Sequence, residues 1–169
     1  VAISSYHKET NDSFSQTMME LYEDDIINKK LIETINEYGA DTIDAVINHE
    51  NDYNFDYFAW RSLQEMYLLK KPTGRVIERP QHMYMRVALW VTTNITDAFE
   101  YYKSLSDQLI SKATPIMINA GTKVPQLASC VLHYNDADSR KGLLDTLTDI
   151  STFSSDAAGI GLSMSNIRS

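Results

Sequence analysis

The sequence predicts a mainly α chain, in which a helical domain is followed by a strand-helix-strand unit. Helical periodicity dominates the first two thirds of the 169 residues. After about residue 112 the helical pattern stops, because Pro115, the turn Asn119-Ala-Gly121 and Pro125 break any helix. Beyond this loop, two stretches of strand composition flank a helical one, and that order implies a parallel crossover.

The helices of the first part follow from apolar spacing. Phe14, Met18, Leu21 and Tyr22 lie on one helix face, so the first helix is expected at about 9–24. Further helices are expected at about 29–37, 39–48, 56–69, 80–91 and 96–111, the last with Thr96 as its N-cap. A turn at Pro72-Thr-Gly74 separates two of these helices.

The second part is expected to contain a strand at 127–132, a helix at about 139–155 with Asp138 as cap, and a strand at 159–167. Two strands leave both sheet edges unpaired, which is too unfavourable for a finished domain. The chain also begins at Val1 rather than at a methionine and ends directly after the last apolar stretch. We therefore expect a piece of a longer protein.

Composition excludes several functional classes. The net charge of −8 argues against a nucleic-acid binder, which needs a basic surface. No apolar run approaches the roughly 20 residues that cross a bilayer, and no secretory signal is visible. The single cysteine, Cys130, cannot form an intramolecular disulfide, which fits the reducing cytoplasm.

Six strings resemble the large, catalytic subunit of class I ribonucleotide reductase, and they occur in the family's order along nearly the whole chain. The most specific are ERPQHMYMRV at 78–87 and NAGTKVPQLASC at 119–130. The six lie at 3–10, 52–58, 78–87, 114–122, 125–130 and 158–162.

The resemblance implies that residues 1–125 are the helical domain that follows a regulatory ATP-cone. Residues 126–169 would be the first strand-helix-strand of an incomplete α/β ten-stranded barrel. The family reduces ribonucleoside diphosphates to deoxyribonucleotides for DNA synthesis by thiyl-radical chemistry. Its radical-bearing cysteine and finger loop have no counterpart in this sequence, so the chain alone is expected to be inactive.

By resemblance, Cys130 is one of two cysteines that become a disulfide during reduction, a role that suits a thiol. Thr114, Ser129 and Gly159 match positions that contact the substrate. Taken without the resemblance, the same residues also fit a small buried cysteine, solvated hydroxyls and tight strand packing.

Asp138, Ser139 and Arg168 match the family's site for a deoxynucleoside triphosphate effector, although an ordinary helix cap also explains the first two. Two features depart from the family pattern. Arg140 replaces an apolar residue, and Ser155-Asp156 stands where a basic side chain commonly holds the triphosphate. A carboxylate there repels phosphate, so effector binding is expected to be weak, altered or lost.

The resemblance also implies cofactors and partners. This chain itself is expected to bind no cofactor or metal, apart from the effectors dNTP and ATP. The radical would come from a di-iron or dimanganese centre on a separate small subunit, and electrons from thioredoxin or glutaredoxin. Partners would be that small subunit, the remainder of the large subunit, the nucleoside diphosphate and a second copy through helix 139–155, but no DNA, RNA or membrane. Leu143, Leu144, Leu147 and Ile150 share one face of that helix.

Other prominent residues are expected to be structural. His49, His82 and His133 have no metal-ligand spacing, and Glu78-Arg79 fits a charged turn. An aromatic cluster is expected to pack between helices rather than to stack on bases; it comprises Tyr53, Phe55, Tyr57, Phe58 and Trp60. Two alternatives to a reductase piece remain: a nucleotide-binding or dimerisation module without catalysis, and one half of a naturally split reductase subunit.

Overall fold

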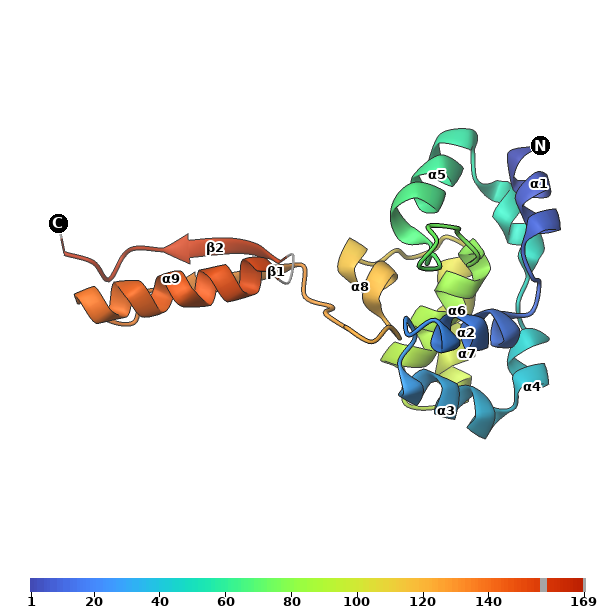
Figure 1. Ribbon diagram of the computed structural model, residues 1–169, viewed down its shortest axis with the longest axis horizontal. Helices are drawn as coiled ribbons and strands as arrows, with labels where there is room; N and C mark the ends of the chain where they lie inside the picture. The colour runs from blue at the N-terminus through green and yellow to red at the C-terminus, as the bar shows by residue number, and fades with distance from the viewer. Residues whose placement is uncertain (156–157, 169) are drawn as a thin grey trace. The chain divides into compact units, whose positions relative to one another are not determined.

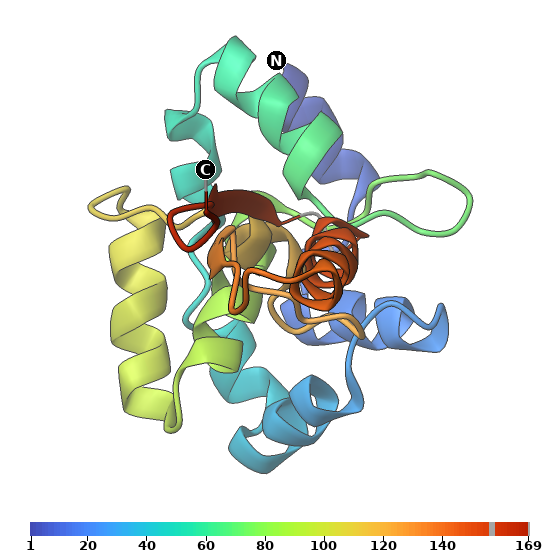
Figure 2. The ribbon, with the colours of Figure 1, turned by 90° about the vertical axis from the view of Figure 1, so that its left-hand side faces the viewer.

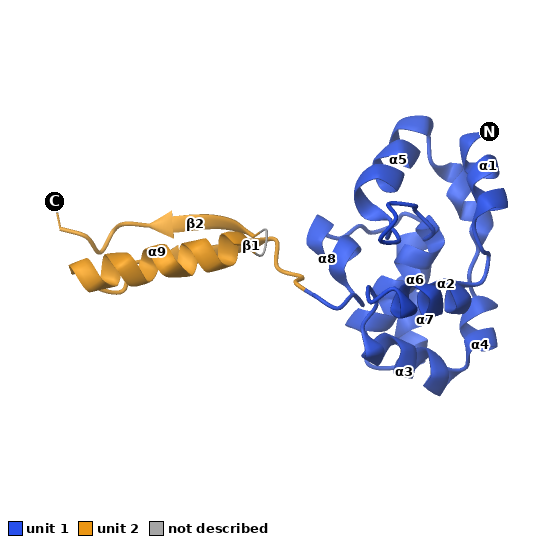
Figure 3. Cartoon of the chain, viewed as in Figure 1, with its two compact units in different colours: residues 1–125 blue, residues 126–169 orange. Residues whose placement is uncertain are grey.

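The computed structural model describes residues 1–155 and 158–168, which divide into two compact units (Figure 3). The first, Val1–Pro125, is helical, and the second, Gln126–Ser169, contains a two-stranded parallel sheet and a helix. The predicted fold class, a mainly α chain that ends in a strand-helix-strand unit, is confirmed. That these units are a reductase's helical domain and the start of its barrel stays a prediction.

The helical unit is arranged around α6 (Pro80–Val91), which Figure 1 shows among the other helices. Residues 80–89 of α6 are all buried, because the helix carries apolar side chains around most of its circumference. Its main neighbour is α7 (Ile95–Ser106). The remaining helices are α1 (Ala2–Glu9), α2 (Phe14–Glu23), α3 (Lys29–Tyr38), α4 (Ala40–Asp44), the 3₁₀ helix η1 (His49–Asn54), α5 (Tyr57–Ser62), the π-helical turn η2 (Leu63–Tyr67) and α8 (Thr114–Asn119).

The predicted helix at 9–24 is wrong at its start, since two helices occupy residues 2–23 and a break separates them. Ser13 caps α2 by accepting a hydrogen bond from the Gln16 backbone N–H at 3.1 Å. Thr10 Oγ1 donates to the Tyr6 carbonyl at the end of α1. Short polar side chains that bond to nearby backbone groups favour such breaks over a continuous helix.

Two further expectations fail because of capping chemistry. Asn94, not Thr96, caps α7, and its side chain accepts from the Asp97 N–H at 2.9 Å. Residues 114–119 form α8 although Pro115 was expected to break any helix. Proline is compatible with the first turn, where its missing N–H has no helical partner in any case.

The second unit consists of β1 (Cys130–Tyr134), α9 (Arg140–Ser155) and β2 (Gly159–Ser163). The strands are parallel, with Cys130 opposite Gly159, and Figure 2 looks nearly along the axis of α9, the orange-red helix. Buried Thr146 of α9 donates to the Asn135 side chain at 2.9 Å. The first strand was expected at 127–132, but β1 begins three residues later and ends two residues later. β2 starts where predicted and ends four residues earlier, and the type and order of the strands are as predicted.

The aromatic cluster is only partly a core feature. Trp60 is 2% exposed and packs on Tyr6, with ring centroids 4.8 Å apart. Tyr53 of η1 is 48% exposed, and Tyr57 and Phe58 of α5 are 71% and 80% exposed, so the expectation of core packing is wrong for these three. For the latter two the reason is geometric: α5 has six residues and turns a single face toward the interior.

None of the helices within 1–155 and 158–168 is long and apolar enough to cross a membrane.

Candidate functional site

Three of the four residues predicted at the substrate site meet where the parallel strands begin. The strand register sets Cys130 opposite Gly159, and the Gly159 N–H donates to the Ser129 carbonyl at 2.9 Å. A Cβ at Gly159 would lie 3.5 Å from Cys130 Sγ, in ordinary van der Waals contact, so the bare backbone of the glycine lies directly beside the sulfur. Cys130 is a free, exposed thiol, and Ser129 is also exposed. The strand ends therefore present a thiol, a hydroxyl and an uncovered backbone together.

The fourth predicted residue, Thr114, belongs to the helical unit. It is the first residue of α8, and its exposed hydroxyl lies 3.2 Å from the Tyr67 hydroxyl. Either oxygen of this pair can donate the hydrogen bond. Thr114 thus offers a hydroxyl at the surface, next to a phenol that comes from η2.

The predicted effector residues lie at the other end of the strands. Arg168 Nε is 3.1 Å from Asp138 Oδ2, and the Arg168 backbone N–H donates to the same oxygen at 3.3 Å. Ser139 caps α9, because its Oγ accepts from the Gly142 N–H at 3.0 Å. The prediction that Asp138 caps this helix is therefore wrong. Its carboxylate pairs with Arg168 instead.

The loop that carries Asp138 is held tightly against α9. A Cβ at Gly142 would lie 2.3 Å from the Ala137 carbonyl oxygen, far inside contact distance. The buried Asn135 side chain donates to the same carbonyl at 2.7 Å and accepts from Thr146. The first turn of α9 and residues 135–138 therefore fix each other.

Comparisons with known proteins show which sequences this chain is similar to. Residues 53–125 match the family described as ribonucleotide reductase, all-alpha domain. Over 99% of its length, the chain is 39% identical to the ribonucleoside-diphosphate reductase large subunit of Variola virus. The large subunits of Dictyostelium discoideum and Arabidopsis thaliana are 35% and 36% identical, also over 99% of the chain.

The chain is homologous to the ribonucleotide reductase large subunit. It spans only part of these relatives, namely 23%, 20% and 22% of the Variola virus, Dictyostelium and Arabidopsis subunits. Most of each relative's sequence therefore has no counterpart in this chain.

The structure describes two of the three residues that were expected to depart from the reductase pattern, and both lie in α9. Arg140 is the first residue of α9 and is exposed. Ser155 is the last residue of α9, and its hydroxyl donates to the Thr152 carbonyl at 2.7 Å. Asp156 lies outside the described residues.

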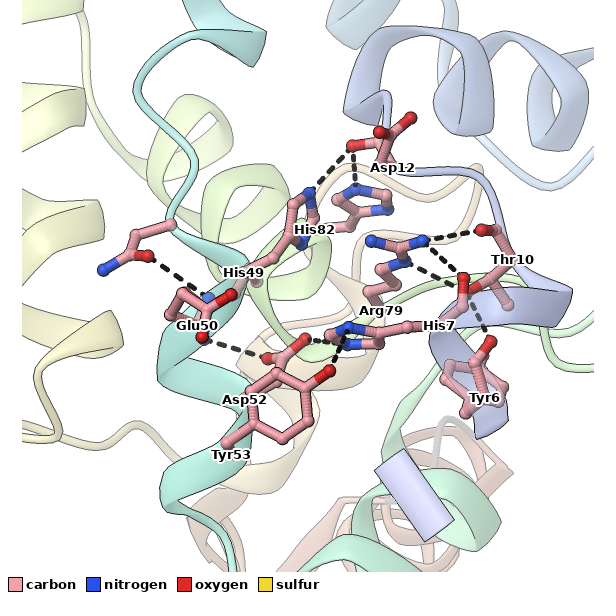
Figure 4. A network of polar contacts seen from close by, with 12 residues as sticks. Tyr6, His7, Thr10, Asp12, His49, Glu50, Asp52, Tyr53, Arg79 and His82 are labelled. Carbon is pink, nitrogen blue, oxygen red and sulfur yellow. Dashed lines mark hydrogen bonds and ion pairs between the residues drawn. The ribbon is translucent and has the colours of Figure 1, made fainter. Parts of the chain in front are cut away.

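A buried polar network in the helical unit was not foreseen from the reductase resemblance (Figure 4). Nε2 of His49 and Nε2 of His82 lie 2.8 and 3.2 Å from the same Asp12 carbonyl oxygen. Burial lowers the pKa of both imidazoles, most strongly for fully buried His82. His7 Nε2 lies 2.8 Å from Oδ2 of buried Asp52. Spacing in the sequence gives no indication that these histidines meet, because the helices that carry them come from distant segments.

Within residues 1–155 and 158–168, no group of three or more histidine, cysteine, aspartate or glutamate side chains is placed to hold a metal ion.

The expectation that Glu78-Arg79 is a charged turn is wrong, since Glu78 is 0% and Arg79 5% exposed. Arg79 donates to Thr10 Oγ1 at 3.0 Å and to the carbonyls of His7 and Thr10. A guanidinium therefore satisfies carbonyls at the C-terminal end of α1, where a cation is favoured. Charge alone suggests a surface, and only the adjoining run of apolar residues in 80–91 indicates that these side chains enter the core.

Proposed function

We propose that this chain is part of the large subunit of a ribonucleoside-diphosphate reductase. In that role it supplies substrate contacts, one redox cysteine and part of an effector site. The observation that carries the proposal is the meeting of Cys130, Ser129 and Gly159 at the start of the paired strands. Homology over 99% of the chain to reductase large subunits supports it.

The proposed chemistry follows from the exposed thiol. Reduction replaces the ribose 2′-hydroxyl by hydrogen, and the hydroxyl leaves as water after it takes a proton from a thiol. Two thiols lose two electrons and two protons in total and form a disulfide. Since Cys130 is the only cysteine of this sequence, its partner must come from another part of the large subunit. The disulfide is then reduced by an external dithiol such as thioredoxin or glutaredoxin.

Substrate contacts would come from two hydroxyl groups and from one stretch of bare backbone. The hydroxyls of Ser129 and Thr114 suit phosphate or ribose oxygens, because both are exposed and able to donate. The bare backbone at Gly159 lets a ligand approach the thiol closely. Radical chemistry needs a di-iron or dimanganese centre, which we assign to a separate small subunit.

Regulation by a dNTP or ATP would involve Asp138, Ser139 and Arg168. A carboxylate can accept a hydrogen bond from a ribose hydroxyl, and a guanidinium can bind phosphate with two parallel hydrogen bonds. Arg168 is suited to this role because its side chain is 85% exposed although it pairs with Asp138. Ser155 contributes no positive charge at the C-terminal end of α9, so we expect weaker or altered effector selectivity.

A second copy of the chain would pack on α9. Leu143, Leu144 and Leu147 are all exposed on this helix, whereas Thr146 faces the strands. An exposed row of leucines is typical of a helix that packs against a partner. The same surface also supports the alternative function, a dimerisation or nucleotide-binding module without catalysis.

The test uses a complete large subunit that contains this chain, assayed with its small subunit and a dithiol reductant for conversion of a nucleoside diphosphate to the deoxy product. We expect turnover by the wild type and none by Cys130→Ser. The matched control Ser165→Ala, which removes another exposed hydroxyl near the end of β2, should retain turnover. A subunit that binds nucleotide but never reduces it would favour the non-catalytic module.

A further inference from the structure

Glu78 and Arg86 form an ion pair in which both side chains are 0% exposed. Arg86 Nε donates to Glu78 Oε1 at 2.6 Å, and Nη2 donates to Oε2 at 3.0 Å. The second carboxylate oxygen also accepts from the Leu69 N–H at 2.9 Å. Glu78 thus holds the guanidinium in one orientation from the start of α6.

The remaining donors of Arg86 all point at one short helix. Nη2 donates to the Met117 carbonyl at 3.1 Å, and Nη1 donates to the carbonyls of Ile118 and Ala120. These carbonyls belong to the C-terminal end of α8 and the residue after it, where helical partners are lacking. With these bonds the guanidinium uses all of its five N–H donors.

The turn after α8 is built around the same arginine. Gly121 has φ +78, and a Cβ there would lie 3.0 Å from Arg86 Cγ and 3.1 Å from Leu31 Cδ2. The Gly121 carbonyl accepts from the Asn28 N–H at 2.9 Å, and Ile26 accepts from the Lys123 N–H. These contacts fix the turn that follows α8 relative to α3 and α6.

Stability alone is a poor reason for this arrangement. Removing two charges from water is costly, and replacing a buried ion pair by apolar residues is often neutral or stabilising. What an apolar pair cannot do is bond the terminal carbonyls of α8. A helix of six residues does not hold its shape without such external contacts.

We propose that Arg86, oriented by Glu78, is a positioning residue that fixes α8 and thereby sets the place of the Thr114 hydroxyl. This inference rests on the proposed function, in which Thr114 contacts the substrate. Arg86 itself is fully buried, so it acts through the groups that it bonds. Its effect passes through the α8 carbonyls to the first residue of the same helix.

The first test is hydrogen exchange of the 169-residue chain with Arg86→Lys, which keeps the charge but loses the planar fork. We expect the amides of residues 117–122 to exchange about 10- to 100-fold faster, while α2 and α3 change little. The matched control is Arg79→Lys, since Arg79 is an equally buried arginine on the end of α1. It should loosen residues 7–10 and leave α8 protected. A uniform rise along the whole chain in Arg86→Lys would overturn the proposal.

Wild-type protein provides a measurement that does not depend on the variant's folding. If the contacts of Arg86 fix α8, the Ala120 N–H, which bonds to Ile116, should be about as protected as amides of α6. Exchange of that amide far faster than that of α6 would contradict the inference.

The second test uses the complete large subunit. Arg86→Lys should raise KM for the nucleoside diphosphate about tenfold, the loss of one hydrogen bond, with kcat nearly unchanged. Arg79→Lys should leave KM unchanged. Equal KM values in both variants would refute the positioning role, whereas a wild type without activity would refute the proposed function and leave the exchange result standing.

Discussion

Arg168 Nε lies 3.1 Å from Asp138 Oδ2, which joins the segment after β2 to the loop before α9. The guanidinium is mostly exposed, so the pair contributes little to stability in water. A charged ligand could therefore replace either side chain as the partner of the other at a small cost in free energy. In the proposed function, both side chains would instead contact the triphosphate effector.

Replacing Arg168 tests this interpretation. We expect Arg168→Ala to leave the free energy of unfolding unchanged, because the ion pair is exposed. Affinity of the complete subunit for a deoxynucleoside triphosphate should fall about tenfold or more, the cost of a lost charged hydrogen bond. Equilibrium binding of a labelled triphosphate measures this change. The control is Lys141→Ala, which removes an exposed cation from the first turn of α9. Equal losses of affinity in both variants would show that only the net charge matters and would contradict a specific role of Arg168.

Gly142→Ala should disrupt the loop that carries Asp138. Its Cβ would meet the Ala137 carbonyl oxygen at 2.3 Å, so the loop or the first turn of α9 has to move. Overpacking of this kind costs about 1–3 kcal/mol. Hydrogen exchange of residues 135–146 should rise, whereas Asp145→Ala, an exposed change in the same helix, should have little effect. Unchanged protection in Gly142→Ala would contradict the contact.

Stability should fall with acid through His49 and His82. Burial lowers the pKa of both in the folded chain, so the unfolded chain binds more protons below its own histidine pKa of about 6.5. The contribution of these histidines to the free energy of unfolding is then fully present above about pH 6.5. It decreases as the pH falls below that value, until the folded-state pKa is passed. Each imidazole adds at most about 1.4 kcal/mol per pH unit. Arg79 and His7 also act on both rings, and Asp52 acts on His49, which is why a variant comparison is needed.

Urea unfolding between about pH 5 and about pH 7.5 measures this dependence on both sides of the histidine pKa. His82→Gln should flatten the acid side of the curve, since the amide does not titrate. His133→Gln removes an imidazole from β1 and serves as control. An acid slope in His82→Gln equal to that of the wild type would refute the role of the pair at Asp12.

The thiol of Cys130 should react in the folded chain. It is exposed, and its strand neighbour Gly159 has no side chain that could cover the sulfur. We expect alkylation by iodoacetamide at a rate within about threefold of that in urea, because exposure controls access to the thiolate. Cys130 is the only cysteine, so the intact mass reports this reaction alone. A thiol that reacts only after unfolding would contradict the exposed site.

Several elements could be predicted from local sequence. The helix at 80–91 has the predicted bounds, because Pro80 suits a first turn and mostly apolar residues follow from Met83 to Val91. The order of β1, α9 and β2 also followed from composition. Periodicity failed where a polar side chain ended or started a helix. The bonds of Ser13 and Asn94 to nearby N–H groups compete with helix extension and leave the apolar pattern unchanged.

The candidate site shows a similar division. A parallel crossover brings the starts of its two strands together, which favours a first strand that begins close to Gly159. The register of Cys130 opposite Gly159 could not be predicted, because the first strand was expected at 127–132 and β1 begins at Cys130. The buried pair of Glu78 and Arg86 could not be derived, because a charged residue near a turn is usually exposed. A single arginine within the apolar run MYMRVALW was the one indication in the sequence. Its partners lie at residue 78 and at residues 117–120, which periodicity does not connect.

We propose that Cys130 gives up its thiol hydrogen during nucleotide reduction. The most direct test is one turnover by a pre-reduced complete large subunit with its small subunit, a nucleoside diphosphate and no external reductant. Peptide mapping by mass spectrometry then follows the residue. The account predicts that Cys130 is found in a disulfide with a second cysteine of the large subunit, in proportion to the deoxynucleotide formed. Product formation with Cys130 still a free thiol would contradict it.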